Sequence, residues 1–417
     1  MKLSQFLNNA FHQYGQYRGG LCGWKDIDEF LYKPERCFRL LHYFLDLDKS
    51  GQTAQDLNYL SLYRCQHIFV TFLMGLGLIQ KYNLLNGVNV INNMPDEYLW
   101  MLTSVVHDYG YLKHGLTDMP KLADVDEEYQ LLSDGCTYSQ LSTTADYSVN
   151  YPQFMTYSYD TIRKYYAYKS NRLAEARVSG YYNKDGETVD HGIYGACQCF
   201  REYCDFYIKH EYPRSCIAPE DNKDDVVSLG YDHYTINERP EIVKLARTEP
   251  VLYKTACLIA AQHNIFRSSN IDSDKIYSQY GLDSLLSTTP IAVTKDNPLL
   301  YLLSIVDTIE CTKCFENLYL NEDDKRNHSN DFGLSMKEVL YNVEIETEDD
   351  GFIIDHTGLE SVIGGYWSLC NRKGKRAIMY EALTKQITNV AELSSWIDCS
   401  TKMVGSLALR IEINSKF

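Results

Sequence analysis

His107 and Asp108 are adjacent in the segment SVVHDYGYLKHG, directly behind an apolar stretch. Neighbouring positions on a helix point about 100° apart, so an imidazole and a carboxylate here can reach one centre placed between them. The apolar stretch predicts a partly buried place, where a carboxylate is costly unless it is paired or bound to a metal. Because this dipeptide occurs by chance in many chains, its meaning depends on residues elsewhere in the sequence.

Further residues of ligand type each stand in or beside an apolar segment with helical character. They are His67 before IFVTFLMGLGLI, His191 in DHGIYGA, His263 in LIAAQHN and Asp307 in PLLYLLSIVDTIE. Small neighbours such as Gly195 and Ala260 let helix backbones approach closely. His42 competes with His67, but it is followed by FLDLDKSG rather than by a long apolar segment.

The complete set offers four imidazoles and two carboxylates. Imidazole and carboxylate together suit Mn, Fe, Ni or Zn, whereas Ca and Mg prefer oxygen ligands. Six ligands exceed what one catalytic metal takes while keeping a position open, so we expect two divalent metal ions bridged by Asp108. A single histidine of this kind is more often a structural core residue, and only the ordered set favours a metal site.

The order His, His-Asp, His, His, Asp resembles the HD-domain metal-dependent phosphohydrolase superfamily over roughly residues 60–318. The residues that match its motif are His67, His107, Asp108, His191, His263 and Asp307. The elements HGIYGA, AAQH and LLSIVDTIE look most like the bacterial dinucleoside tetraphosphate hydrolase branch. The Lys that often follows the doublet is displaced to Lys113, and the insertion at 115–188 is long.

This resemblance implies a hydrolase in which two metals hold a bridging water, lower its pKa and bind phosphate oxygens. Asp108 would then serve as a ligand and as a catalytic residue. The expected substrate is a small nucleotide, cleaved at a phosphoester or phosphoanhydride bond. The nucleotide itself stays open among a dinucleoside polyphosphate, a cyclic dinucleotide and a nucleoside triphosphate.

Nearby cationic residues are candidates for contacts to the substrate. Lys113 could supply a phosphate contact or a proton, which makes it the second catalytic candidate. His114 lies seven residues after His107, on the same face if the helix continues through Gly110. Arg267 follows His263 by one turn and could bind a phosphate with two hydrogen bonds. Exposed surface positions are the alternative for all three candidates.

Composition is that of a folded, acidic protein. The 417 residues are 45% hydrophobic and 23% charged, which allows a sizeable core in two or three units. The net charge of −16 disfavours binding to extended nucleic acid or to an anionic membrane. The thirteen cysteines are scattered, and the first residues lack an apolar leader, so we expect a cytoplasmic protein.

Hydrophobic periodicity predicts a mainly α protein with a small α+β module at its end. The expected parts are a helical segment at 1–57, an HD-type helical bundle at 58–320 with an insertion at about 115–188, and the α+β module at 335–417. VLYNVEIETEDDGFIID alternates like a β-hairpin that turns at 348–351, and SLALRIEI like a strand. A calcium loop at 46–57 is rejected, because Leu57 stands where glutamate is needed.

Other functions remain open at this point. A di-iron oxygenase could use the same ligands, and a non-catalytic nucleotide sensor could use the α+β module as its effector. Under any of these functions, the C-terminal module could form a homo-oligomer or cover the active site. A single-strand nuclease is disfavoured, because no Lys/Arg stripe accompanies the net charge of −16. The pair Cys311 and Cys314 is weak support for zinc without a second such pair.

Overall fold

The structure is a computed structural model that describes part of the chain. It describes 1–17, 62–84, 96–110, 256–264, 271–286, 298–312, 336–349, 351–359 and 410–414, together with 226–228, 233–235 and single positions at 27, 164, 191–192, 195–196, 199 and 393. The chain divides into two compact units. Unit 1 contains Met1–Tyr43, Asp56–Asn86 and Phe266–Phe417, and unit 2 contains Phe44–Gln55 and Gly87–Ile265.

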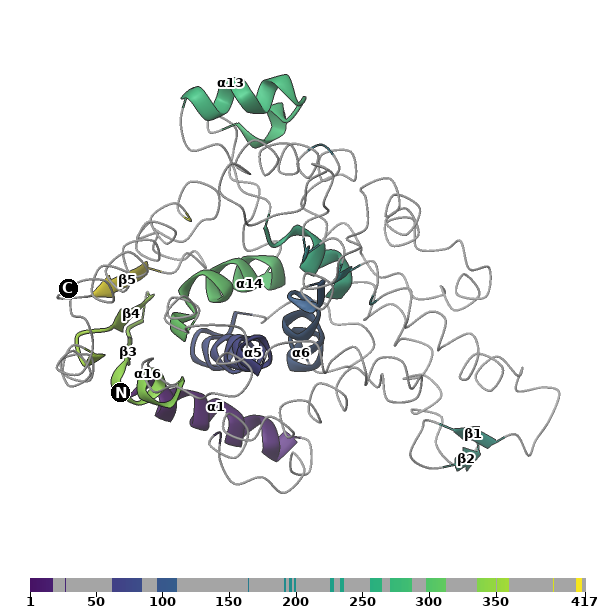
Figure 1. The fold of residues 1–417 in the computed structure, drawn as a ribbon. Helices are drawn as coiled ribbons and strands as arrows, with labels where there is room; N and C mark the ends of the chain where they lie inside the picture. The colour runs from purple at the N-terminus through teal and green to yellow at the C-terminus, as the bar shows by residue number, and fades with distance from the viewer. Residues whose placement is uncertain are drawn as a thin grey trace. The chain divides into compact units, whose positions relative to one another are not determined.

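The described residues are mostly helical, as the sequence predicts (Figure 1). The HD-type bundle stays a prediction, and so do the predicted domain boundaries. Apart from Lys164, the predicted insertion at 115–188 lies outside the described residues, as does most of the 1–57 segment beyond residue 17. None of the described helices is long and apolar enough to cross a bilayer.

Helix α5 (Leu62–Tyr82) is the core helix of unit 1. Every side chain from Gln66 to Ile79 is buried, as expected for a helix that is apolar on nearly all sides. It packs between α1 (Leu3–Tyr17) and α14 (Pro298–Ile309), which lie on either side of it in Figure 1. Gly77 permits the approach of α1, because a Cβ atom there would lie 2.5 Å from the ring of Phe6.

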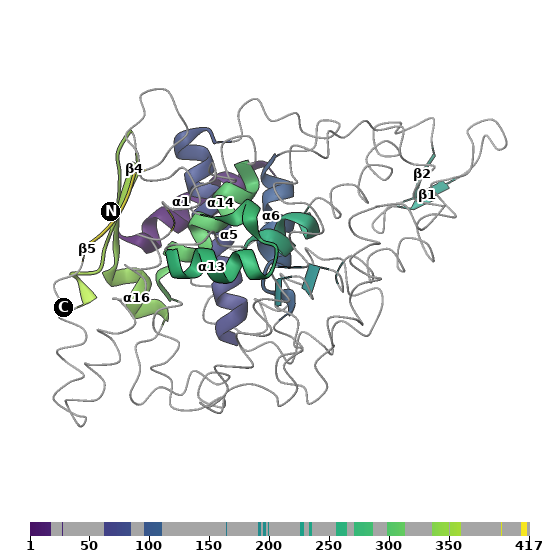
Figure 2. The same ribbon diagram turned by 90° about the horizontal axis from the view of Figure 1, so that it is seen from above.

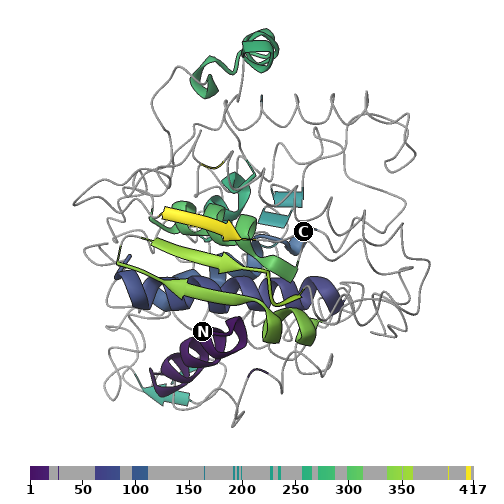
Figure 3. The ribbon, with the colours of Figure 1, turned by 90° about the vertical axis from the view of Figure 1, so that its left-hand side faces the viewer.

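A three-stranded sheet completes the described core of unit 1 (Figure 3). Strands β3 (Glu344–Thr347) and β4 (Gly351–Asp355) form the predicted antiparallel hairpin, and β5 (Arg410–Asn414) pairs in parallel with β4. Ile345 pairs with Ile354, and Phe352 with Ile411, so apolar residues share one face. The pairing confirms that the alternating segment around Ile411 and Ile413 is a β-strand.

The predicted hairpin begins later than its alternating pattern indicates. Val339 and its neighbours lie in α16 (Met336–Asn342) rather than in a strand. Val339 and Leu340 are both buried, and α16 packs against α1. Adjacent buried residues fit a helix packed on its neighbour, whereas the alternating pattern predicted a strand with only every second side chain buried. The expectation of a strand before Asn342 was therefore wrong.

The first residues of the chain join the same sheet. Met1 and Ile345 exchange main-chain hydrogen bonds of 2.8 and 2.9 Å, and Leu3 N–H donates to the carbonyl of Val343 at 2.9 Å. The Tyr82 hydroxyl at the end of α5 donates to the carbonyl of Gly351. Figure 2 shows the N-terminus beside the strands. Helices α5 and α14, which carry candidate ligands, therefore belong to one packed body with the sheet. The other described elements of unit 1 are α13 (Ile271–Gln279) and the short 3-10 helix η7 (Asp283–Leu285).

Unit 2 is described more sparsely. Helix α6 (Asp96–Val106) begins directly after Pro95, and its side chains from Leu99 onward are buried. A second helical segment covers 256–262, and single helical positions are described at 191–199. Strands β1 (Val226–Ser228) and β2 (His233–Thr235) form an antiparallel pair. Both described helical segments of this unit end beside candidate ligands.

Candidate metal centre

The six predicted metal ligands fall into two groups, one in each unit. His67 and Asp307 belong to unit 1, and His107, Asp108, His191 and His263 belong to unit 2. All six are described, and His191 is the only one of them that is not buried. The predicted contacts Lys113, His114 and Arg267 lie outside the described residues.

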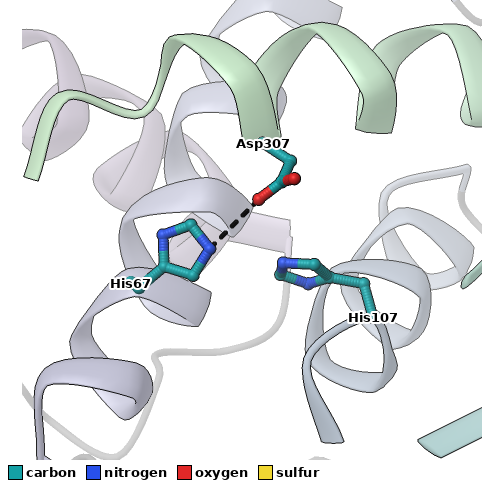
Figure 4. A group of neighbouring side chains, drawn as sticks. All are labelled: His67, His107 and Asp307. Carbon is teal, nitrogen blue, oxygen red and sulfur yellow. Dashed lines mark ion pairs between the residues drawn. The ribbon is translucent and has the colours of Figure 1, made fainter. Parts of the chain in front are cut away.

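In unit 1, a histidine and a carboxylate meet between two packed helices. His67 comes from α5 and Asp307 from α14 (Figure 4). The Nε2 atom of His67 lies 3.2 Å from Asp307 Oδ1, and the His67 side chain has no exposed surface. His107, also drawn in Figure 4, belongs to unit 2 and is described with it below.

Glu310 is a member of the unit 1 group that the sequence analysis did not assign. Its Oε2 atom accepts a hydrogen bond of 2.7 Å from Nδ1 of His67, and both side chains are fully buried. The available signal was spacing, because Glu310 follows Asp307 by three positions and residues so spaced share a helix face. His67 thus contacts a carboxylate at each of its ring nitrogens.

In unit 2, the Asp108 carboxylate lies among imidazoles. Its Oδ1 atom is 3.4 Å from Nε2 of His191 and 3.6 Å from Nε2 of His107. The rings of His107 and His191 lie edge to face with that of His263, at centroid distances of 5.3 and 5.4 Å. One ligand atom from each of Asp108, His191 and His263 lies within 4.8 Å of the other two.

Two of these histidines are oriented by helix ends. His107 follows the last residue of α6, and its Nδ1 donates to the carbonyl of Ser104 at 2.6 Å. His263 follows the helical segment 256–262, and its Nδ1 donates to the carbonyl of Ala260. The last carbonyls of a helix have no intrahelical partner, so a histidine three residues later can satisfy one of them. In each ring this leaves Nε2 as the nitrogen available for a metal.

Glycines allow the segment around His191 to approach these helix ends. A Cβ atom on Gly110 would lie 2.0 Å from the carbonyl oxygen of His191, and one on Gly195 would lie 2.3 Å from the Gly110 nitrogen. A Cβ atom on Gly192 would meet the ring of His263 at 3.1 Å. The glycines of HDYG and HGIYG therefore permit main-chain contact that brings His191 beside Asp108.

The end of α6 also decides a condition on which the placement of His114 depended. The helix stops at Val106 and is followed by a turn and a short 3-10 segment through Gly110. The helix therefore does not continue through Gly110, and the condition for placing His114 on the same face as His107 is not met. The Nδ2 atom of Asn264, the residue after His263, lies 3.0 Å from Nε2 of His191. No role for Asn264 was expected from the sequence.

The donor set of both groups fits a borderline divalent metal. Two ligands at about 2.1 Å from one ion are roughly 3.0 to 3.4 Å apart, depending on the coordination geometry. The contacts of 3.2 Å in unit 1 and 3.4 Å in unit 2 are close to this spacing. Nitrogen donors with one carboxylate suit Mn, Fe, Ni or Zn better than Ca or Mg.

Comparisons with protein-family models, with curated proteins and with solved structures found no match to this chain. The resemblance to the HD superfamily therefore depends on the six motif residues and on the elements around them.

Proposed function

We propose that this chain is a metal-dependent phosphohydrolase that cleaves a phosphoester or phosphoanhydride bond of a small nucleotide. The observation that carries the proposal is the group of Asp108, His191 and His263, in which Asp108 and His263 are buried and the ligand atoms lie within 4.8 Å of one another. A carboxylate buried among imidazoles is costly unless hydrogen bonds or a cation compensate for the lost water. A divalent cation is the compensation that this donor set fits.

Two metal positions are proposed, as the ligand order of the sequence predicts. His67 and Asp307 are the proposed donors within unit 1, and the proposed donors within unit 2 are His107, Asp108, His191 and His263. The support is that each group has its own carboxylate with an imidazole Nε2 within 3.4 Å of one carboxylate oxygen. A single metal would leave one of the two groups without a cation.

Hydrogen bonds within the protein orient the candidate ligands and determine which ring nitrogen carries the lone pair. Hydrogen bonds from Nδ1 of His67, His107 and His263 select the tautomer whose Nε2 can bind a metal. His191 is 13% exposed, against 1% for Asp108, so it lies on the more accessible side of its group. When bound, a pair of divalent cations lowers the pKa of water and neutralises charge on phosphate oxygens.

Phosphate is favoured as the substrate group because of the protein's charge. With a net charge of −16, the chain repels anions except near a local positive centre, and bound cations supply such a centre. Lys113 and Arg267 are each proposed to contact substrate phosphate. The absence of a Lys/Arg stripe from the sequence favours a small nucleotide over extended nucleic acid.

Metal analysis of the purified protein, combined with a panel of nucleotides read by chromatography, tests this function. We expect two metal equivalents and release of phosphate or of a nucleoside phosphate. Asp108→Ala is expected to remove both metal and turnover. Asp283→Ala is the matched control, because it makes the same change at an exposed carboxylate that accepts a hydrogen bond from Ser278.

Each other outcome contradicts a particular part of the proposal. Full metal occupancy in Asp108→Ala would show that Asp108 does not bridge. Oxygen uptake by the iron-loaded protein, without release of phosphate, would identify the di-iron oxygenase. Nucleotide binding without turnover at any metal would identify the sensor.

A further inference from the structure

We propose that Glu310 is a positioning residue, which orients His67 and makes the His67–Asp307 position the tighter of the two metal positions. This inference rests on the proposed metal centre and adds a residue and an order of metal affinity to it. Each contact that it compares lies within a single unit.

The Glu310 carboxylate is held by contacts at both of its oxygens. Oε1 accepts hydrogen bonds from the main-chain N–H of Thr312 at 2.8 Å and from its hydroxyl at 2.6 Å. Oε2 faces Nδ1 of His67 at 2.7 Å. The main-chain N–H of Glu310 continues the α14 pattern by donating to Val306 at 2.9 Å. The contacts with Thr312 therefore hold the Glu310 carboxylate in place independently of its contact with the His67 imidazole.

This contact determines which nitrogen of His67 can bind a metal. A carboxylate accepts but does not donate, so Nδ1 must carry the hydrogen. The lone pair of the neutral ring is then on Nε2, the atom that lies 3.2 Å from Asp307. A carboxylate behind a metal-binding histidine also raises the basicity of the ligand.

The other oriented histidines have weaker acceptors behind them. Nδ1 of His107 donates to the main-chain carbonyl of Ser104, and Nδ1 of His263 to that of Ala260. A hydrogen bond to an ionised carboxylate is roughly twice as strong as one between neutral groups. We therefore expect His67 to be the strongest donor of the three. The metal that it binds should have the higher affinity of the two.

A plain structural alternative exists. Glu310, His67 and Asp307 could be a buried ion triad that only stabilises the contact between α5 and α14. In that case a change at Glu310 lowers stability and leaves metal affinity unaltered. The two readings differ in a measurement that needs no substrate.

Glu310→Gln is the decisive variant, because it preserves size and removes the charge. An amide has one acceptor oxygen, while the N–H of Thr312 and Nδ1–H of His67 both require an acceptor. If the amide oxygen faces Thr312, its NH₂ group faces His67 and forces the wrong tautomer. Ser304→Ala is the control, because this buried side chain on the same helix has no hydrogen-bond partner for its hydroxyl among the described residues.

The experiment measures Mn²⁺ binding by the full chain over a graded series of free metal, with Mn²⁺ alone as the probe. We expect two classes of site in the unaltered protein. In Glu310→Gln the tighter class should weaken about 10- to 100-fold, and the other class should be unchanged. Ser304→Ala should bind like the unaltered protein. Nitrogen-15 NMR of the Zn²⁺-loaded protein should show the His67 tautomer changing only in Glu310→Gln.

Several results would overturn the inference. Unaltered affinity in Glu310→Gln with a lower melting temperature would leave Glu310 a structural residue. Weakening of the looser class instead would reverse the order of affinities. If Glu310→Gln does not fold, Thr312→Val provides the test, since loss of its hydroxyl contact should weaken the same class by a smaller factor, and no change would contradict the proposal. Two metal classes without nucleotide turnover would refute the hydrolase and leave the role of Glu310 standing.

Discussion

The two groups of candidate ligands are built by different means. In unit 1, His67 and Asp307 stand within long apolar helices whose side chains pack against each other, and a buried carboxylate orients the histidine. In unit 2, His107 and His263 follow helix ends, and main-chain carbonyls orient them. The first group depends on side-chain packing, whereas the second depends on main-chain geometry.

This difference determines which substitutions should disturb each group. A helix packed on all sides tolerates few changes of volume, but its ligands keep their places as long as the helices pack. Ligands at helix ends depend on how closely another main-chain segment approaches. In unit 2, that approach requires glycine, because Cβ atoms at Gly110 and Gly195 would lie only 2.0 and 2.3 Å from neighbouring main-chain atoms.

The largest effect on turnover is expected when one ligand is removed from either group. His67→Ala and His263→Ala should each lower kcat/KM by at least about a thousandfold, or ~4 kcal/mol of transition-state stabilisation. Each variant should retain about one metal equivalent, because the other group keeps its ligands. Metal analysis beside steady-state kinetics measures both quantities. If either single change removes both metals, the two groups do not act as separate halves.

Two glycine substitutions distinguish the close main-chain approach in unit 2 from the helix packing in unit 1. Gly110→Ala should lower turnover about a hundredfold, since a displacement of roughly 1 Å at a site costs that much. Gly77→Ala should instead lower stability by about 1 to 3 kcal/mol through overpacking against the Phe6 ring, while metal content is retained. Thermal melts and metal analysis of both variants make the comparison. Equal loss of metal in the two variants would contradict the distinction between main-chain approach and helix packing.

A smaller effect is expected at Gly192. A Cβ atom there would lie 3.1 Å from the His263 ring and from the Ala260 carbonyl, a distance at which neighbours shift by tenths of an ångström. Gly192→Ala should therefore weaken one metal equivalent by about tenfold, as changes beside a metal ligand do. A titration with Mn²⁺ measures this affinity. Affinity as in the unaltered protein would show that the His263 ring has room to move.

The smallest effect on turnover is expected in the sheet. Ile354 is fully buried and pairs with Ile345, so Ile354→Val should lower stability by about 1 kcal/mol through the lost methylene group. Metal content and turnover at 25 °C should stay unchanged, because the change is conservative and involves no ligand. Denaturant unfolding and the nucleotide assay test this together. A loss of metal would mean that the sheet helps to position the ligands on α5 and α14.

Much of the local structure could be predicted from the sequence. The apolar stretches before Tyr82, Val106 and Ile309 are helices, and the alternation after Val343 is a hairpin, because periodicity reports local geometry. The ligand types were also visible, since a histidine or an aspartate inside an apolar segment needs a reason to be there. Among the described residues, alternation misled at Val339, which lies in a helix with its buried neighbour Leu340.

What the sequence alone determined was therefore the identity and order of the candidate donor residues and the helices beside them. Tertiary structure alone decided which nitrogen each ring presents and which glycines let His191 reach Asp108. It also brought Glu310 to His67, a residue 243 positions away. The physical reason is that hydrogen bonds and close approaches between distant segments leave no periodic trace in the chain, whereas burial of a helix face or a strand face does.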